Sequence, residues 1–225
     1  MKNNAKRWAG KTIIGLTGNI GTGKSVVRLM LEHLGALGID ADAVSHGIIE
    51  KGSSGYLPVV EYFGSAILTQ AEEIDRKQLG RIVFSNPEAL QVLEKIIHPR
   101  VSEAVDMLIN SSSNPVAVIE AIKLIEGYLG QDCDSIWVVT ADQQTQLNRL
   151  VLQRKMSEAD ALQRIQAQPP QEEKLRHADV VIDNSGTLEE TWQQVKRAWQ
   201  RLFPGQELPA AFQDHAIEAI TKEQA

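Results

Sequence analysis

The chain has 225 residues, of which 43% are hydrophobic and 23% are charged, and its formal net charge is −6. This length suits one domain with an inserted or appended lobe, and the apolar fraction is high enough for a substantial core. The acidic balance argues against a broad nucleic-acid-binding surface, so a polyanionic substrate must be held by a few local cations. The single cysteine, Cys133, excludes an internal disulfide bond.

The first eleven residues are polar and basic, and they lack the apolar segment of a signal peptide. No later run is apolar over the length that spans a membrane. We therefore expect a cytoplasmic protein that needs neither a membrane nor nucleic acid, and that is a monomer or a weak homo-oligomer.

The most informative segment lies near the start of the chain. The apolar run Thr12–Thr17 leads into the glycine-rich Gly18–Ser25, which leads into the helix-like Val26–Leu34. This order predicts a phosphate-binding loop, whose glycines let backbone N–H groups turn inward while the next helix directs its positive end at the same point. Lys24 adds a cation for the outer phosphates, and the Ser25 hydroxyl is placed to bind the Mg²⁺ that accompanies a nucleoside triphosphate. The alternative is a glycine-rich turn without a ligand.

A second segment is expected to contact the base of the nucleotide. A GTPase would carry an Asn-Lys-x-Asp element after a late strand, whereas this chain has Val181–Gly186 there. The predicted nucleotide-binding residues are Gly18, Asn19, Ile20, Gly21, Thr22, Gly23, Lys24, Ser25, Val26 and Asn184, with Ser25 also the predicted metal ligand.

Five short β-rich runs alternate with helical segments along the chain. They are Thr12–Thr17, Leu37–Asp40, Val116–Glu120, Ser135–Thr140 and Val180–Asp183. Such alternation predicts an α/β fold with a five-stranded parallel sheet covered by helices on both faces. About 75 residues separate the second run from the third, far more than one crossover helix needs. An inserted helical lobe is therefore expected over residues 43–110.

Helix starts are marked by capping residues. We expect caps at Asp142, Ser157 and Thr187, the last two with an acidic residue three positions later. Asn86-Pro87 supplies a cap and a first-turn proline for another helix, which is expected to end near His98-Pro99. After residue 203 the pattern weakens, so the tail over 204–225 is expected to be a peripheral helix or disordered.

Two carboxylates follow the second predicted strand, in Ile39–Asp42. Parallel sheets bind ligands at the carboxyl ends of their strands, where the glycine-rich loop also falls. Asp42 could accept a proton from an attacking hydroxyl, which would make the second substrate an alcohol. Alternatively, Asp40 or Asp42 caps the helix that begins near Ala43.

Three arginines lie on two consecutive predicted helices, at positions 149, 154 and 164. Such arginines can close over a triphosphate and neutralise the charge that spreads over the transferred group. They could equally be the solvated face of amphipathic helices. We favour catalytic roles for Arg149 and Arg154, beside Lys24 and Asp42.

Together these segments resemble the dephospho-coenzyme A kinase family, and the resemblance is distributed over most of the chain. The matching segments include Gly15–Ser25, Ile39–Asp42, Ile74–Gly80, His98-Pro99, Arg164-Ile165, Ala178-Asp179 and Val181–Gly186. The glycine-rich loop is the most specific of them, and the others add weight through their order and spacing.

The resemblance implies a P-loop kinase domain over 11–203, in which the lobe over 43–110 binds the acceptor and 149–176 form an arginine-bearing lid. The implied reaction moves the γ-phosphate of ATP to the ribose 3′-hydroxyl of dephospho-CoA, with Mg²⁺, in the last step of coenzyme A synthesis. Asp42 corresponds to the proposed general base of the family. Other possible functions are a P-loop kinase for another nucleotide or small alcohol, and an ATP-binding regulatory module without turnover.

The chain departs from the family pattern at two places. Val26 follows Lys24-Ser25 where the family usually has threonine, and Ile122 and Lys123 replace a proline and a leucine after the third strand. Glu126 is retained in that segment. We expect catalysis to survive the first change, because Ser25 still supplies a hydroxyl for the metal.

Overall fold

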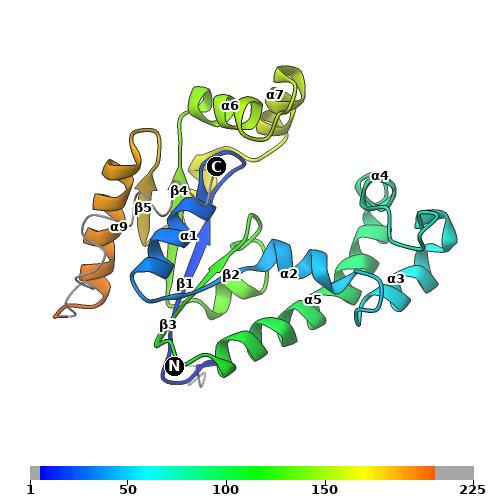
Figure 1. Ribbon diagram of the computed structural model, residues 1–225, viewed down its shortest axis with the longest axis horizontal. Helices are drawn as coiled ribbons and strands as arrows, with labels where there is room; N and C mark the ends of the chain where they lie inside the picture. The colour runs from blue at the N-terminus through cyan, green and yellow to red at the C-terminus, as the bar shows by residue number, and fades with distance from the viewer. Residues whose placement is uncertain (1–5, 206–225) are drawn as a thin grey trace. The chain divides into compact units, whose positions relative to one another are not determined.

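The computed structural model describes residues 6–205, so the predicted tail beyond Gly205 lies outside the described residues. Its centre is a five-stranded sheet in the order β2-β3-β1-β4-β5, and the pairings of β1 with β3, β1 with β4 and β4 with β5 are parallel (Figure 1). The strands are β1 (Thr12–Thr17), β2 (Leu37–Asp40), β3 (Val116–Glu120), β4 (Ser135–Thr140) and β5 (Val180–Asp183). The expected strands and fold class are therefore confirmed.

The chain divides into two compact units. Unit 1 comprises Met1–Ile39 and Ser112–Ala225, and unit 2 comprises Asp40–Ser111. Unit 1 contains the strands, whereas unit 2 is built from helices and begins at the last residue of β2.

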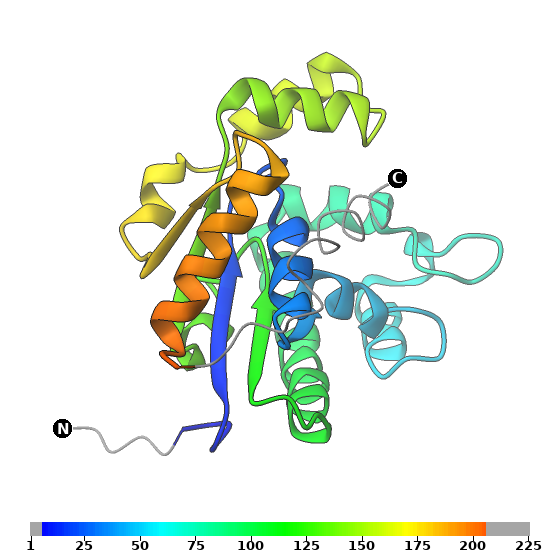
Figure 2. The same cartoon turned by 60° about the vertical axis from the view of Figure 1, so that its left-hand side comes forward.

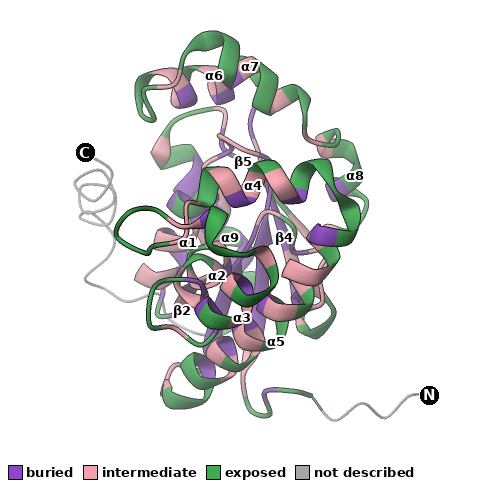
Figure 3. Cartoon of the chain, turned by 90° about the vertical axis from the view of Figure 1, so that its right-hand side faces the viewer, coloured by how far each residue is buried: buried purple, intermediate pink, exposed green. Residues whose placement is uncertain are grey.

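The main core of unit 1 lies between the sheet and two helices, α1 (Lys24–His33) and α9 (Leu188–Leu202). These helices lie side by side over one face of the sheet (Figure 2). Apolar residues of the strands and of these two helices form one buried cluster, whose largest side chains are Trp137, Trp192 and Trp199. Figure 3 shows the buried residues concentrated on the strands, as expected for a parallel sheet.

The remaining helices of unit 1 follow β3 and β4: η2 (Leu129–Asp132), α6 (Gln143–Leu152), α7 (Glu158–Gln166) and α8 (Gln171–Leu175). The predicted caps are confirmed, since Asp142, Ser157 and Thr187 each accept a hydrogen bond from a backbone N–H of the first turn. Only Thr187 forms the full reciprocal box, with Glu190.

Unit 2 consists of α2 (Ala41–Ile48), α3 (Tyr56–Phe63), η1 (Ser65–Ile67), α4 (Arg76–Ser85) and α5 (Pro87–Ser111). The helix that starts at Pro87 does not end near His98-Pro99, so that prediction is wrong; it continues through Pro99 for a total of 25 residues. Proline removes one backbone hydrogen bond, but a buried stripe at Ile97, Val101, Val105 and Ile109 keeps one face of the helix packed. Packing against α2, α3 and α4 therefore outweighs the local cost.

None of the helices within residues 6–205 combines the length and the apolar character needed to span a membrane.

Candidate functional site

The glycine-rich loop joins β1 to α1, the order of elements that the sequence predicts. Gly23 is the N-cap of α1 and has a φ of 87°, in the left-handed region that favours glycine. A Cβ atom at Gly23 would lie 2.1 Å from the side-chain amide nitrogen of Asn184, and one at Gly18 would lie 2.3 Å from the carbonyl oxygen of Val139. Both positions therefore need glycine for conformation and for space.

Lys24 begins α1 and is only 8% exposed. Its Nζ lies 3.4 Å from the carbonyl oxygen of Asn19, inside the curve of the loop. No side chain of the described residues caps the first turn of α1, and that turn carries no acidic residue. The positive end of the helix and a buried ammonium group thus act on the same region, which favours an anion.

The loop is supported from behind by Asn184, which follows β5 and is fully buried. Its side-chain nitrogen donates to the carbonyl oxygen of Thr22 at 2.8 Å, and its side-chain oxygen accepts from the Thr191 hydroxyl at 2.8 Å. The Thr22 hydroxyl in turn donates to the carbonyl oxygen of Asn19. Asn184 therefore stabilises the conformation of the loop through its bond to Thr22.

Arg149, on α6, reaches the same loop. Its guanidinium donates to the carbonyl oxygens of Gly21 at 3.3 Å, Thr22 at 3.1 Å and Asn184 at 2.7 Å. Burial lowers the pKa of this arginine, and the carboxylate of Asp142 partly offsets the effect. The structure thus brings Arg149 to the loop, whereas Arg154 lies exposed in the break between α6 and α7.

The segment between α7 and α8 also contacts the loop. The side-chain amide of Asn19 donates to the carbonyl oxygen of Pro169 at 2.8 Å, and the backbone N–H of Ile20 donates to the side-chain oxygen of Gln168 at 2.6 Å. These two bonds tie the first half of the glycine-rich loop to residues of the expected lid.

Ser25 lies beside a carboxylate, Glu120, that the sequence motifs do not mark. Its hydroxyl donates to Glu120 Oε1 at 3.0 Å, and Arg28 Nε donates to Glu120 Oε2 at 2.9 Å. Glu120 is the last residue of β3, the neighbour of β1, and its side chain is 6% exposed. In the sequence, Glu120 could have been found as the carboxylate that ends an otherwise apolar strand. Within residues 6–205, no group of three or more His, Cys, Asp or Glu side chains is arranged to hold a metal.

The two aspartates after β2 have different positions in unit 2. Asp40 is the N-cap of α2 and accepts from the backbone N–H of Ala43 at 2.8 Å, while Asp42 lies in the first turn and is half-buried. Of the two capping alternatives, the structure therefore favours Asp40.

The segment after β3, where the chain departs from the family pattern, is held by a buried lysine. Lys174 donates to the carbonyl oxygen of Ile122 at 2.8 Å and to Glu126 Oε1 at 2.9 Å. Burial alone would raise the pKa of Glu126, but the hydrogen bond from Lys174 and the nearby lysine charges lower it below its ordinary value. Lys123 is exposed.

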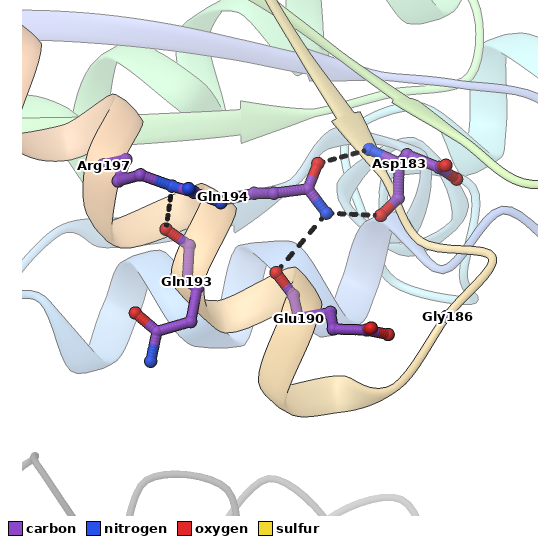
Figure 4. A pocket seen from close by; sticks show the side chains of 6 residues that line it. All are labelled: Asp183, Gly186, Glu190, Gln193, Gln194 and Arg197. Atoms are coloured by element: carbon purple, nitrogen blue, oxygen red, sulfur yellow. Dashed lines mark hydrogen bonds between the residues drawn. The ribbon is translucent and has the colours of Figure 1, made fainter.

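A surface hollow lies between the end of β5 and α9. It is lined by Asp183, Gly186, Glu190, Gln193, Gln194 and Arg197. Figure 4 shows the Gln194 side chain reaching the backbone of Asp183, where it accepts from the N–H at 2.9 Å and donates to the carbonyl oxygen at 2.7 Å. Because β5 is the edge strand, this amide pairs with backbone groups that have no neighbouring strand. It therefore helps to place the segment that contains Asn184.

A glycine-rich loop between a strand and a helix, with a buried lysine and with a serine bonded to a carboxylate on the neighbouring strand, defines a P-loop nucleoside-triphosphate-binding protein. The family model for dephospho-CoA kinase matches residues 12–190. The chain belongs to the dephospho-CoA kinase family, which confirms the resemblance and the expected class of ATP-dependent kinase.

Individual relatives and solved structures resemble this chain over most of its length. The dephospho-CoA kinase of Geobacter sulfurreducens is 41% identical over 195 residues, which cover 85% of this chain and 99% of the relative. A solved structure from Thermus thermophilus has a TM-score of 0.77 at 29% identity and covers 87% of this chain and 99% of that one. Dephospho-CoA kinase from Campylobacter jejuni has a TM-score of 0.54 at 27% identity, with 86% and 98% covered.

Proposed function

We propose that this chain transfers the γ-phosphate of ATP to the ribose 3′-hydroxyl of dephospho-CoA, giving coenzyme A and ADP. The observation that carries the proposal is the match of the family model over residues 12–190, on a chain whose P-loop retains a buried lysine. The fold alone would not suffice, because P-loop proteins include switches and motors as well as kinases.

On the donor side, we propose that residues 18–26 bind the triphosphate. Lys24 and the backbone N–H groups at the start of α1 neutralise the outer phosphates, and Lys24 remains in contact as charge moves during transfer. Val26 lacks the hydroxyl of the usual threonine, and its backbone N–H donates to the carbonyl oxygen of Gly23 at 3.1 Å.

The residues present also fit a magnesium ion. The Ser25 hydroxyl and the Glu120 carboxylate lie 3.0 Å apart, and hydroxyl and carboxylate oxygens are the ligands that Mg²⁺ prefers. Bound there with ATP, the ion would supply positive charge to the β- and γ-phosphates. We propose Ser25 as the direct ligand and Glu120 as the group that orients it.

On the acceptor side, we propose that the helical residues 43–110 bind dephospho-CoA and that Asp42 takes the proton of the attacking hydroxyl. The assignment of the cap to Asp40 supports this role, because Asp42 is not needed to start α2. A positioned carboxylate of this kind contributes about a hundredfold or more to the rate.

The arginines have separate proposed tasks. Arg149 is anchored on the carbonyl oxygens of the loop and holds it for the phosphates, while the exposed Arg154 closes from the lid region 149–176 onto the transferred group. Asn184 connects the loop to the proposed base-contacting segment, because its side chain bonds to Thr22. We further propose that the chain acts in the cytoplasm, as a monomer or weak homo-oligomer, on small molecules and not on nucleic acid.

The test is direct. Purified protein is incubated with ATP, Mg²⁺ and dephospho-CoA, and the product is analysed by mass spectrometry and phosphorus NMR for one added 3′-phosphate. Nucleoside monophosphates and shikimate-like alcohols serve as competing acceptors, with ADP formation as the common readout. Preferred phosphorylation of a competitor, or ATP binding without turnover on any acceptor, would contradict the proposal.

A further inference from the structure

The Glu120 carboxylate shares its two oxygens between two different groups of α1. Oε1 accepts from the Ser25 hydroxyl at 3.0 Å, and Oε2 accepts from Arg28 Nε at 2.9 Å. The guanidinium therefore lies on the same carboxylate that faces the proposed metal ligand. Ser25 and Arg28 are three residues apart on a helix, which places them one turn apart on the same side.

Arg28 is itself held in place by a second acid. Its Nη1 pairs with the carboxylate of Glu32, four residues later on α1. Burial alone would lower the pKa of Arg28, but Glu32 and Glu120 together raise it above its ordinary value. The side chain of Arg28 is 19% exposed and that of Glu120 is 6% exposed, so this ion pair is only weakly screened by solvent.

A buried carboxylate with no counterion is strongly unfavourable, and a divalent cation or a guanidinium can each supply the missing charge. Arg28 supplies it from within the chain. Because the guanidinium already balances the charge of Glu120, this carboxylate attracts a bare Mg²⁺ to Ser25 less strongly. A metal that arrives bound to a triphosphate depends less on Glu120, because the phosphates themselves supply negative charge.

We propose that Arg28 tunes the metal site by neutralising Glu120, so that this chain takes up a divalent cation together with the nucleotide and not alone. Arg28 is a positioning residue in this role, since it acts through Glu120. The inference rests on the proposed Mg²⁺-dependent function, but it concerns binding and can be measured without turnover.

The experiment measures Mn²⁺ binding to the nucleotide-free, full-length protein, from the loss of the free-Mn²⁺ signal in electron paramagnetic resonance. Arg28→Gln removes the charge and keeps hydrogen-bonding groups, and we expect it to bind Mn²⁺ at least about tenfold more tightly than the wild type. Arg28→Lys keeps the charge and should bind as weakly as the wild type. Arg197→Gln removes an exposed arginine of α9 and is the matched control, with no expected change.

The double variant Arg28→Gln/Glu120→Gln tests the route of the effect. If Arg28 acts through Glu120, the gain in Mn²⁺ affinity disappears in the double variant. An affinity of Arg28→Gln within about twofold of the wild type, or a gain that survives the loss of Glu120, would overturn the proposal.

Should Arg28→Gln not fold, Glu32→Gln gives an independent measurement with the opposite sign. It leaves the whole guanidinium charge facing Glu120, so Mn²⁺ binding should weaken; unchanged binding would count against the proposal. Turnover of dephospho-CoA by the wild type is assayed separately. A protein without that turnover but with the expected Mn²⁺ affinities would overturn the proposed function and leave the role of Arg28 standing.

Discussion

The two units of this chain differ in whether they bury polar side chains. Within residues 6–205, every buried polar or charged residue lies in unit 1; these are Thr17, Asn19, Thr22, Lys24, Glu120, Ser135, Gln146, Lys174, Asn184 and Thr191. Unit 2 has an apolar interior. Most of the exposed large apolar side chains also lie in unit 2, among them Leu57, Tyr62, Phe84 and Met107, whereas Leu152 and Val181 are exposed in unit 1.

The difference is informative because burying a polar group costs free energy unless it is hydrogen-bonded. In unit 1 hydrogen bonds around the P-loop offset part of that cost, among them those of Asn184 with Thr22 and Thr191, although the side-chain oxygen of Asn19 is buried without a partner. Unit 2 has the simpler packing of a helical lobe. We infer that unit 1 is preorganised for phosphate chemistry, whereas the proposed role of unit 2 depends on its surface and on Asp42.

The strongest test of this contrast removes the buried cation of the P-loop, Lys24. Lys24→Ala should weaken ATP binding and also lower kcat, with kcat/KM falling by about a thousandfold, because the ammonium serves both bound and reacting phosphates. Steady-state kinetics and calorimetric titration of ATP measure the two effects. Arg201→Ala, which removes an exposed cation of α9, is the control. Retention of full ATP affinity in Lys24→Ala would break the contrast.

The corresponding change in unit 2 should separate rate from binding. Asp42→Asn is expected to lower kcat by about a hundredfold and to leave ATP affinity unchanged, because a positioned base is lost and the donor site is not touched. Asp40→Asn is the matched control, since asparagine caps a helix about as well as aspartate. An unchanged kcat in Asp42→Asn would remove Asp42 from the catalytic role.

Core substitutions in the two units should both destabilise but should differ in function. Asn184→Ala leaves the partners at Thr22 and Thr191 unsatisfied and should cost about 2–4 kcal/mol of unfolding free energy. Ile67→Ala, at a fully buried position in unit 2, should cost about 2–5 kcal/mol through the cavity it leaves. Urea denaturation measures both. Only Asn184→Ala should also weaken ATP binding, so an equal loss in the two variants would contradict a specific role for Asn184.

The smallest expected effect concerns one ion pair from each unit. In unit 1, Glu126 pairs with the buried Lys174, and the pKa of Glu126 is lowered in the folded state. The pair therefore stabilises the protein at pH values above the ordinary pKa near 4.5. This stabilisation is lost as the pH falls through the lower pKa of the folded state. Glu126→Gln should therefore lower stability at neutral pH and converge with the wild type in acid.

In unit 2, Glu72 pairs with Lys51, and both side chains are largely exposed. Glu72→Gln should change stability little, and any effect should vanish in about 0.5 M salt, where exposed charges are screened. Urea midpoints at neutral and acid pH, with and without salt, compare the two pairs. A Glu126 contribution that is as salt-sensitive as that of Glu72 would show that burial of Lys174 does not matter.

Local rules were sufficient for the strands, for the P-loop and for the caps at Asp142, Ser157 and Thr187. Each depends on neighbouring residues: an apolar run, glycines at positions with positive φ, or a side chain that bonds to the next turn. Elements of this kind can be predicted because their energetics do not involve distant parts of the chain.

Other features depend on contacts between residues far apart in the sequence. The continuation of α5 through Pro99 follows from a buried stripe packed against three other helices, which no local rule weighs against the proline. The pairing of Glu120 with Arg28 requires β3 to lie beside β1, because 92 residues separate the two side chains along the chain. Arg149 could be singled out as a lid cation, but its anchoring on loop carbonyls depends on how α6 folds back.

The amino-acid order alone thus specified a P-loop kinase, down to its strands and the place of its glycine-rich loop, because those signals are short-range. Which carboxylate meets Ser25, which arginine neutralises it and which amide supports the loop were settled only on folding. The physical reason is that buried polar partners must satisfy one another across the sheet.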